Sequence, residues 1–245
     1  MNTQPLPLAR RRAKDYYGRR MEIFPGIHWL KGVIGGNSWL VMETGYAFVI
    51  DTGSPGNAHH ILRCAQNLGV GDKLKYIVLT HADIDHAGSA AELKKLTGAA
   101  IAVHTAEVPF MAEKSNLPGA LRWLGGVFPK MSRCARFEPD QLLNEGDVIG
   151  AYEVVHVPGH TPGSICLYEP RKLIFTGDAL RTHAHDRLLP PSRPTALNLR
   201  QATDSMRKIA GLDFYALFGG HGPPVIGNAG AKLRDMISRL PREAF

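Results

Sequence analysis

The chain has 245 residues, with 29 basic and 22 acidic side chains and a formal net charge of +7. It is 44% hydrophobic and 21% charged, which allows a sizeable core and excludes a disordered chain. No stretch approaches the ~18 continuous apolar residues of a transmembrane helix, so we expect no membrane span. No linker divides the chain after its N-terminal arm, and we therefore expect a single domain over residues 21–245.

The positive charge is concentrated in residues 1–20, where six basic residues face Asp15 alone. We expect this segment to be a flexible basic arm. The remaining 225 residues are close to neutral, which argues against nucleic acid as a partner. The three cysteines have no CxxC spacing, which excludes a disulfide framework and a Cys-rich zinc site. With no apolar leader after the first basic residues, we expect a cytoplasmic protein.

Apolar runs, turn residues and helical spacing alternate along the chain. The first half predicts strands over 23–30, 38–42 and 46–50, a helix over 57–68, a strand over 75–80, a helix over 90–96 and a strand over 99–103. The second half predicts strands over 154–157, 165–168 and 173–176, a polar loop over 182–196, and a strand over 215–218 between helices over 197–210 and 229–239. Two half-patterns of the same kind predict an α/β fold of two packed mixed sheets with helices outside.

Four potential metal ligands follow the strand over 75–80 within six residues: His81, Asp83, Asp85 and His86. A strand end followed by a tight loop can direct such side chains into one space. The spacing fits neither an EF-hand loop nor the HExxH helix. A solvated loop with helix-capping aspartates is the alternative, but unpaired charges at a buried strand end would be costly. The cluster therefore indicates a metal site.

Three later strands end in the same way, with glycine next to a single His or Asp. These residues are His160 in PGHTPGS, Asp178 in TGDA and His221 in GGHG. Glycine lets the backbone turn sharply and approach a ligand closely. Together with the first cluster they supply seven ligands, enough for two metal ions.

In their order, the motifs DTG, THxxxDHxG, PGHTPGS, TGDA and GGHG resemble those of the metallo-β-lactamase superfamily, over about residues 22–240. The resemblance implies a four-layer αβ/βα sandwich with two metal ions at one edge, between the sheets. The implied ligands are His81, Asp83 and His160 for one ion and Asp85, His86 and His221 for the other, with Asp178 bridging both and Asp51 orienting the ligand histidines.

The family's usual motif is HxHxDH, and this chain carries HxDxDH because Asp83 replaces the second histidine. One ligand set then becomes two histidines and a carboxylate, which serves zinc hydrolases and also non-haem iron enzymes. We expect two divalent ions, zinc first, with iron or manganese as alternatives.

The resemblance implies a dinuclear hydrolase in which a metal-bound hydroxide attacks a small ester, thioester, lactone or related molecule. Two ions that share a water lower its pKa toward ~7. Asp178 and Asp85 are the expected catalytic carboxylates, Asp178 to hold the pair together and Asp85 to pass a proton. The alternatives are a non-haem iron redox enzyme (a sulfur dioxygenase or an oxygen or NO reductase) and a phosphodiesterase or nuclease.

Two regions would decide the substrate: the segment 105–136, expected to be a cap insertion, and the loop after Asp178. Aromatic and apolar residues suit an apolar group, although ordinary helix packing also explains them. A fixed cation in the loop would suit an anionic group. The candidate substrate contacts are Phe110, Met111, Trp123, Phe128, Arg181, His183 and His185. We expect a small-molecule substrate and leave a homodimer open.

The branches of the family fit unequally. Secreted class B β-lactamases fit poorly, because we expect no signal peptide and Asp178 stands where some of them use cysteine. We expect no counterpart of the C-terminal helical region of glyoxalase II, because 24 residues follow His221. Quorum-quenching lactonases are close in size, but Arg181 stands where they often have a tyrosine.

Overall fold

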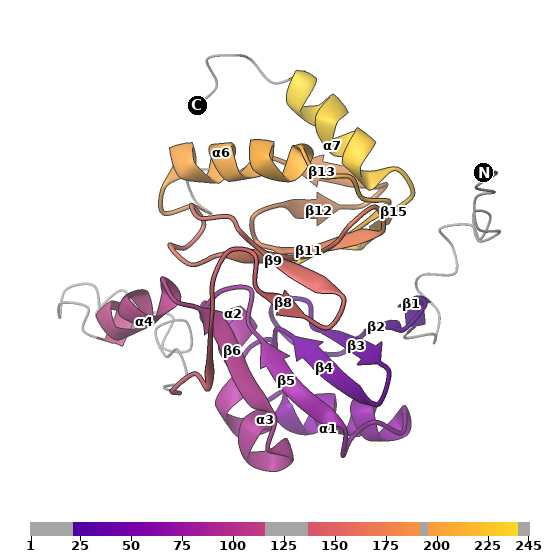
Figure 1. Cartoon of the computed structure of the whole chain (residues 1–245), viewed down its shortest axis with the longest axis vertical. Coiled ribbons are helices and arrows are strands. Elements are labelled where there is room, and N and C mark those ends of the chain that lie inside the picture. Colours follow the sequence, from indigo (N-terminus) through magenta and orange to yellow (C-terminus); the bar gives the residue numbers. More distant parts are fainter. Residues whose placement is uncertain (1–21, 116–136, 192–195, 240–245) are drawn as a thin grey trace.

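Two β-sheets lie face to face, with helices on the outer side of each (Figure 1). The computed structural model describes residues 22–115, 137–191 and 196–239. One sheet has seven strands in the order β1-β2-β3-β4-β5-β6-β7, and the other has six in the order β15-β14-β11-β10-β9-β8. The predicted four-layer αβ/βα sandwich is confirmed.

The first half of the chain builds the seven-stranded sheet and its helices. Its elements are β1 (Glu22–Phe24), β2 (Ile27–Trp29), β3 (Trp39–Glu43), β4 (Tyr46–Ile50), α1 (Ala58–Asn67), β5 (Leu74–Val78), α2 (Ile84–Ala87), α3 (Ala90–Thr97), β6 (Ala100–His104), α4 (Glu107–Ser115) and β7 (Gln141–Leu143).

The second half builds the six-stranded sheet, a separate hairpin and two helices. Its elements are β8 (Val148–Ile149), β9 (Tyr152–His156), β10 (Ile165–Glu169), β11 (Leu173–Gly177), β12 (Arg181–His183), β13 (Arg187–Leu189), α6 (Leu199–Ala210), β14 (Ala216–Gly219), β15 (Val225–Ile226) and α7 (Ala229–Ser238).

The central core lies between the sheets and is rich in aromatic rings. The ring of Phe218 lies 5.2 Å from that of Trp39 and 5.0 Å from that of Phe175, measured between centroids. Two further apolar clusters pack α1 and α3 on one sheet and α6 and α7 on the other. Because both faces of each sheet are covered, strands such as β11 are apolar almost throughout.

Strand direction explains why the ligand loops meet. In the first sheet β4 and β5 are parallel, so the residues after both strands leave the same edge. In the second sheet β11 and β14 are parallel, and β9 runs in the same direction because it is antiparallel to β10, as β11 is. All five strands therefore deliver loops that start at their carboxyl ends, where ligands collect in α/β sheets.

Several predicted boundaries were wrong. The run over 23–30 is two strands, because Gly26 takes a positive φ of 75° in the turn between them. The predicted loop over 182–196 begins instead with the β12–β13 hairpin, whose turn places His185 and Asp186 at positive φ. The one-turn helix α2, which contains His86, was not among the predicted elements.

Some predictions fall on residues that the structure does not describe. They concern the basic arm over 1–20 and, in the predicted cap, Trp123 and Phe128. The described part of that segment begins with α4, on which Phe110 and Met111 are half-buried. Among the described residues no helix combines the length and apolar character needed to cross a membrane.

Candidate metal centre

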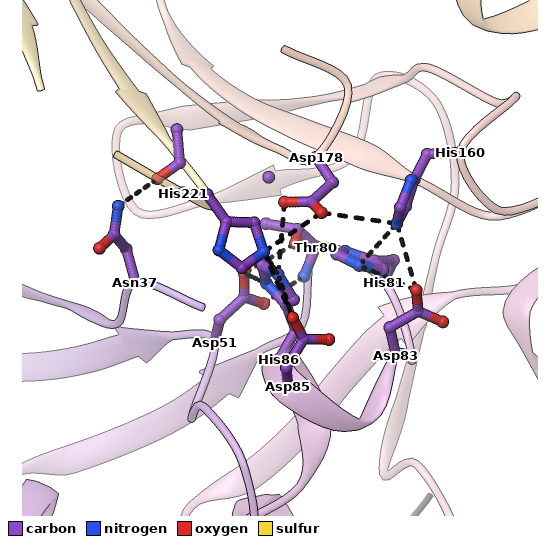
Figure 2. A network of polar contacts seen from close by, with 12 residues as sticks. Asn37, Asp51, Thr80, His81, Asp83, Asp85, His86, His160, Asp178 and His221 are labelled. Atoms are coloured by element: carbon purple, nitrogen blue, oxygen red, sulfur yellow. Dashed lines mark hydrogen bonds and ion pairs between the residues drawn. The ribbon is translucent and has the colours of Figure 1, made fainter. Parts of the chain in front are cut away.

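Four of the seven candidate ligands come from the short connection between β5 and α3. The backbone N–H groups of His86 and Ala87 both donate to the carbonyl of Asp83, which closes the single turn of α2. His81 and His86 are buried, whereas Asp83 and Asp85 are half-buried. The tight turn thus presents two buried imidazoles and two partly exposed carboxylates to one space, as Figure 2 shows.

The first group consists of His81, Asp83 and His160, the set implied for one ion. The Nε2 atom of His160 lies 3.2 Å from Oδ2 of Asp83 and 3.2 Å from Nε2 of His81. His81 and Asp83 approach each other to 3.8 Å. Residues 79 positions apart in the sequence therefore share one small volume.

The second group consists of Asp85, His86 and His221. The Nε2 atom of His221 lies 3.3 Å from Oδ2 of Asp85 and 3.3 Å from Nε2 of His86. His221 reaches this group from the glycine-rich loop after β14 of the other sheet.

Asp178 lies between the two groups. One carboxylate oxygen, Oδ1, is 3.3 Å from Nε2 of His86, and Oδ2 is 3.4 Å from Nε2 of His221 and 3.7 Å from Nε2 of His160. A single carboxylate thus contacts histidines of both groups, which is the arrangement that the bridging role requires.

Asp51 lies behind the histidines and fixes the orientation of two of them. Its Oδ2 lies 2.8 Å from Nδ1 of His86 and accepts a hydrogen bond from the Thr80 hydroxyl, also at 2.8 Å. The same hydroxyl lies 3.0 Å from Nδ1 of His81, so it can accept that N–H while donating to Asp51. In the neutral form of each ring the proton then stays on Nδ1, and the Nε2 lone pair faces the centre.

The donor set fits divalent cations. Imidazole nitrogens face each other at 3.2 and 3.3 Å, and the buried Oδ1 of Asp178 has no aligned hydrogen-bond donor. Within each group the ligand atoms lie within 4.8 Å of one another. Nitrogen and carboxylate ligands suit zinc, iron and manganese. The structure therefore brings together all seven residues, and their binding of metal stays a prediction.

In the metal-free protein the histidines divide into charged and neutral rings. Hydrogen bonds to Asp178 and Asp85 raise the pKa of His221 to about 9. Burial opposes the charge of His86, but the carboxylates of Asp178 and Asp51 raise its pKa well above the usual value. Burial and the neighbouring histidines lower the pKa of His81. For Asp178, the charge of His86 and the hydrogen bond from His221 outweigh burial and lower the pKa.

These shifts predict that zinc binding releases protons. At pH 7.5 His221, with a pKa of about 9, is protonated in the metal-free protein, and the pKa of His86 is also raised, whereas a metal ligand must be neutral. Loading the site should therefore release protons, about one per chain from His221 alone, and apparent affinity should rise as the pH is raised toward 9. Calorimetry in buffers of different ionisation enthalpy measures the release. A proton count of zero at pH 7.5 would contradict this assignment.

The structure says less about the candidate substrate contacts than about the candidate metal ligands. Arg181 and His183 flank Thr182 on β12, and the Thr182 hydroxyl donates to the His221 carbonyl at 2.9 Å. This strand therefore adjoins the His221 loop. His185 is exposed in the hairpin turn. Contact of any of these residues with substrate remains a prediction.

Four residues that hold the site were missed by the sequence analysis: Asn37, Thr80, Thr182 and Glu107. The buried Glu107 accepts hydrogen bonds from the Thr161 hydroxyl and the Gly163 N–H, in the loop that carries His160. Thr80 could have been found from its place next to His81. The others bond mainly to backbone groups, which leave no pattern in the sequence.

The family model described as "Metallo-beta-lactamase superfamily" matches residues 32–221. The chain belongs to this superfamily. It is a metallo-β-lactamase-fold enzyme, and the fold implies divalent metal ions.

Three curated relatives carry hydrolase names. "Probable metallo-hydrolase YflN" of Bacillus subtilis is 29% identical over 91% of this chain and 94% of its own length. "Hydroxyacylglutathione hydrolase GloC" of Haemophilus influenzae is 34% identical over 55% of this chain and 61% of its own length. "Acyl-coenzyme A thioesterase MBLAC2" of Bos taurus is 29% identical over 74% of this chain and 72% of its own length.

Solved structures agree on the fold. A metallo-β-lactamase family protein of Thermus thermophilus, TTHA1429, has a TM-score of 0.70 at 22% identity and is matched over 89% of this chain and 80% of its own. TTHA1623 in a di-iron-bound form has a TM-score of 0.62 at 23% identity, over 81% of this chain and 93% of its own.

Proposed function

We propose that this protein is a dinuclear metal-dependent hydrolase of small acyl compounds, with thioesters as its foremost substrates and esters and lactones as related ones. The observation that carries the proposal is the position of Asp178 between two groups of ligand atoms. Two divalent ions held there would supply an activated water at neutral pH and polarise the substrate carbonyl.

The chain's own residues have distinct tasks in this proposal. Asp51 and Thr80 keep Nε2 of His86 and His81 directed at the centre. Asp178 fixes the separation of the two groups. Asp85 is 38% exposed, and the hydrogen bond from His221 outweighs burial and lowers its pKa. Its carboxylate is therefore ionised and partly open to solvent, so it can pass a proton to a leaving group.

The preference for thioesters is supported by two relatives. Hydroxyacylglutathione and acyl-coenzyme A, the compounds named for them, are both thioesters. The acyl group differs between them, so the shared feature is the bond that is cleaved. We expect the same bond class here and leave the acyl group open.

A non-haem iron redox enzyme is the second candidate. Asp83 makes the first group two histidines and a carboxylate, a set that iron also uses, and the similar TTHA1623 was solved with two irons. In that case the metal-loaded protein would consume oxygen with its substrate, whereas a hydrolase would not.

The test is elemental analysis of protein purified without added metal, followed by a panel of thioester, ester, lactone, β-lactam and phosphodiester substrates with oxygen uptake recorded in parallel. We expect about two divalent ions per chain and thioester turnover without oxygen uptake. Chelation should abolish turnover, and adding the metal back should restore it. Full hydrolysis by a metal-free sample, or oxygen uptake without hydrolysis, would refute the proposal.

A further inference from the structure

Asn37 connects the first sheet to the loop that carries His221 in the second. It lies in the turn between β2 and β3, and its backbone N–H donates to the carbonyl of Gly220 at 2.6 Å. Its side-chain Nδ2 donates to the carbonyls of Gly219 at 3.0 Å and Gly222 at 2.8 Å. One residue thus binds three carbonyls within four consecutive positions that include His221. Figure 2 shows the side chain of Asn37 beside His221.

The loop over residues 219–222 is not held in one conformation by its own residues, because two of its positions must be glycine. A Cβ at Gly220 would lie 2.3 Å from Oδ1 of Asp178, and one at Gly222, where φ is +83°, would lie 2.0 Å from the Thr182 carbonyl oxygen. Glycine is therefore required at both positions, and glycine has the greatest backbone freedom of any residue. Contacts from outside the loop must restrict that freedom.

His221 is also the site histidine that packing restrains least. Its side chain is 38% exposed, against 11% for His160 and 1% or less for His81 and His86. The buried rings are held by their surroundings and by Asp51 and Thr80. His221 instead depends on where its backbone lies. Asn37 and the Thr182 hydroxyl help to set that position, together with the hydrogen bond from the Gly220 N–H to the Gly177 carbonyl.

We propose that Asn37 is a positioning residue that places His221 for the metal group formed with Asp85 and His86. The inference rests on the proposed metal pair and adds that one of the two ions depends on Asn37. In Asn37→Asp the side chain keeps its size, but two donors are replaced by a carboxylate that faces two carbonyl oxygens. Asn37→Ala removes the same donors without adding a charge.

The experiment is a titration of the metal-free, full-length protein with ZnCl₂ against a chromophoric chelator, which resolves two binding constants. Loss of a residue that orients a metal ligand typically weakens binding about 10–100-fold. We expect Asn37→Asp and Asn37→Ala to weaken one constant by about tenfold or more and to leave the other unchanged. Asn144→Ala removes an exposed asparagine that bonds Thr105, and it serves as the control that changes neither constant.

A double-mutant cycle with His221→Ala decides whether the effect passes through His221. Once His221 is absent, Asn37→Ala should weaken zinc binding no further. If Asn37→Ala lowers affinity by the same factor in both backgrounds, or changes neither constant, the inference is wrong. A different result would contradict the proposed function: in that case the unmodified protein would not bind two ions. Circular dichroism of each metal-free variant shows that the fold is intact, and Asn37→Ser replaces any variant that does not fold.

Discussion

Asp178→Asn should reduce turnover to the background rate and lower the bound metal from two ions per chain toward one or none. The substitution keeps the shape of the side chain but removes the negative charge that lies between His86, His160 and His221. An amide also turns an N–H donor toward at least one position where a cation would lie, so it opposes binding by either group. Elemental analysis and thioester hydrolysis measure the two effects.

Asp186→Asn is the matched control for this experiment. Asp186 is an exposed aspartate in the β12–β13 turn and pairs with Lys232 at 2.8 Å. Surface pairs of this kind contribute little to stability, so metal content and turnover should stay near those of the unmodified protein. If the Asp178 variant kept two ions and full turnover, the assignment of Asp178 as the shared ligand would have to be abandoned.

Asp51→Asn should lower metal affinity or activity by about 10–100-fold, the range typical for residues that orient metal ligands. The loss should affect both groups, because Asp51 contacts His86 directly and reaches His81 through the Thr80 hydroxyl. An asparagine amide placed against Nδ1 of His86 favours the tautomer with its proton on Nε2, which removes the lone pair a cation needs.

Backbone strain does not explain this expected loss. Asp51 has a φ of 56°, a conformation that asparagine adopts as readily as aspartate. Thr80→Val provides the comparison, because it removes the hydroxyl next to His81 and leaves the contact between Asp51 and His86 in place. Zinc titration should then show one weakened constant for Thr80→Val and two for Asp51→Asn. If both variants instead weakened only one zinc-binding constant, and by the same factor, Asp51 would not serve both groups.

From the sequence, the residues that the structure brings together were easier to predict than the boundaries of the strands. His81, Asp83, Asp85 and His86 were found because they crowd one strand end. His160, Asp178 and His221 were found because each lies beside a glycine after an apolar strand. Which residues share an ion came from the resemblance alone, and the structure then placed the implied groups together.

The elements and contacts that the sequence did not predict were missed for physical reasons. The strands β7, β8 and β15 have three or two residues, too few to show alternation. The turn of the β12–β13 hairpin places two consecutive non-glycine residues, His185 and Asp186, at positive φ. The polar sequence of this segment does not indicate that conformation. Asn37 bonds to carbonyl oxygens about 180 positions away, and because every residue has a carbonyl oxygen, such a bond leaves no pattern in the sequence.

The division of the ligands between the two sheets has a consequence for stability. His81 and Asp83 follow a strand of the first sheet, and His160 follows a strand of the second, so an ion held by all three would act as a cross-link between the layers. The unfolded chain has no such arrangement, and any ligand that binds only the folded state shifts the unfolding equilibrium with its concentration. The sandwich would therefore resist separation of its two halves more strongly as free metal increases, with the logarithm of its concentration above saturation, and proteolysis between β7 and β8 would measure that resistance.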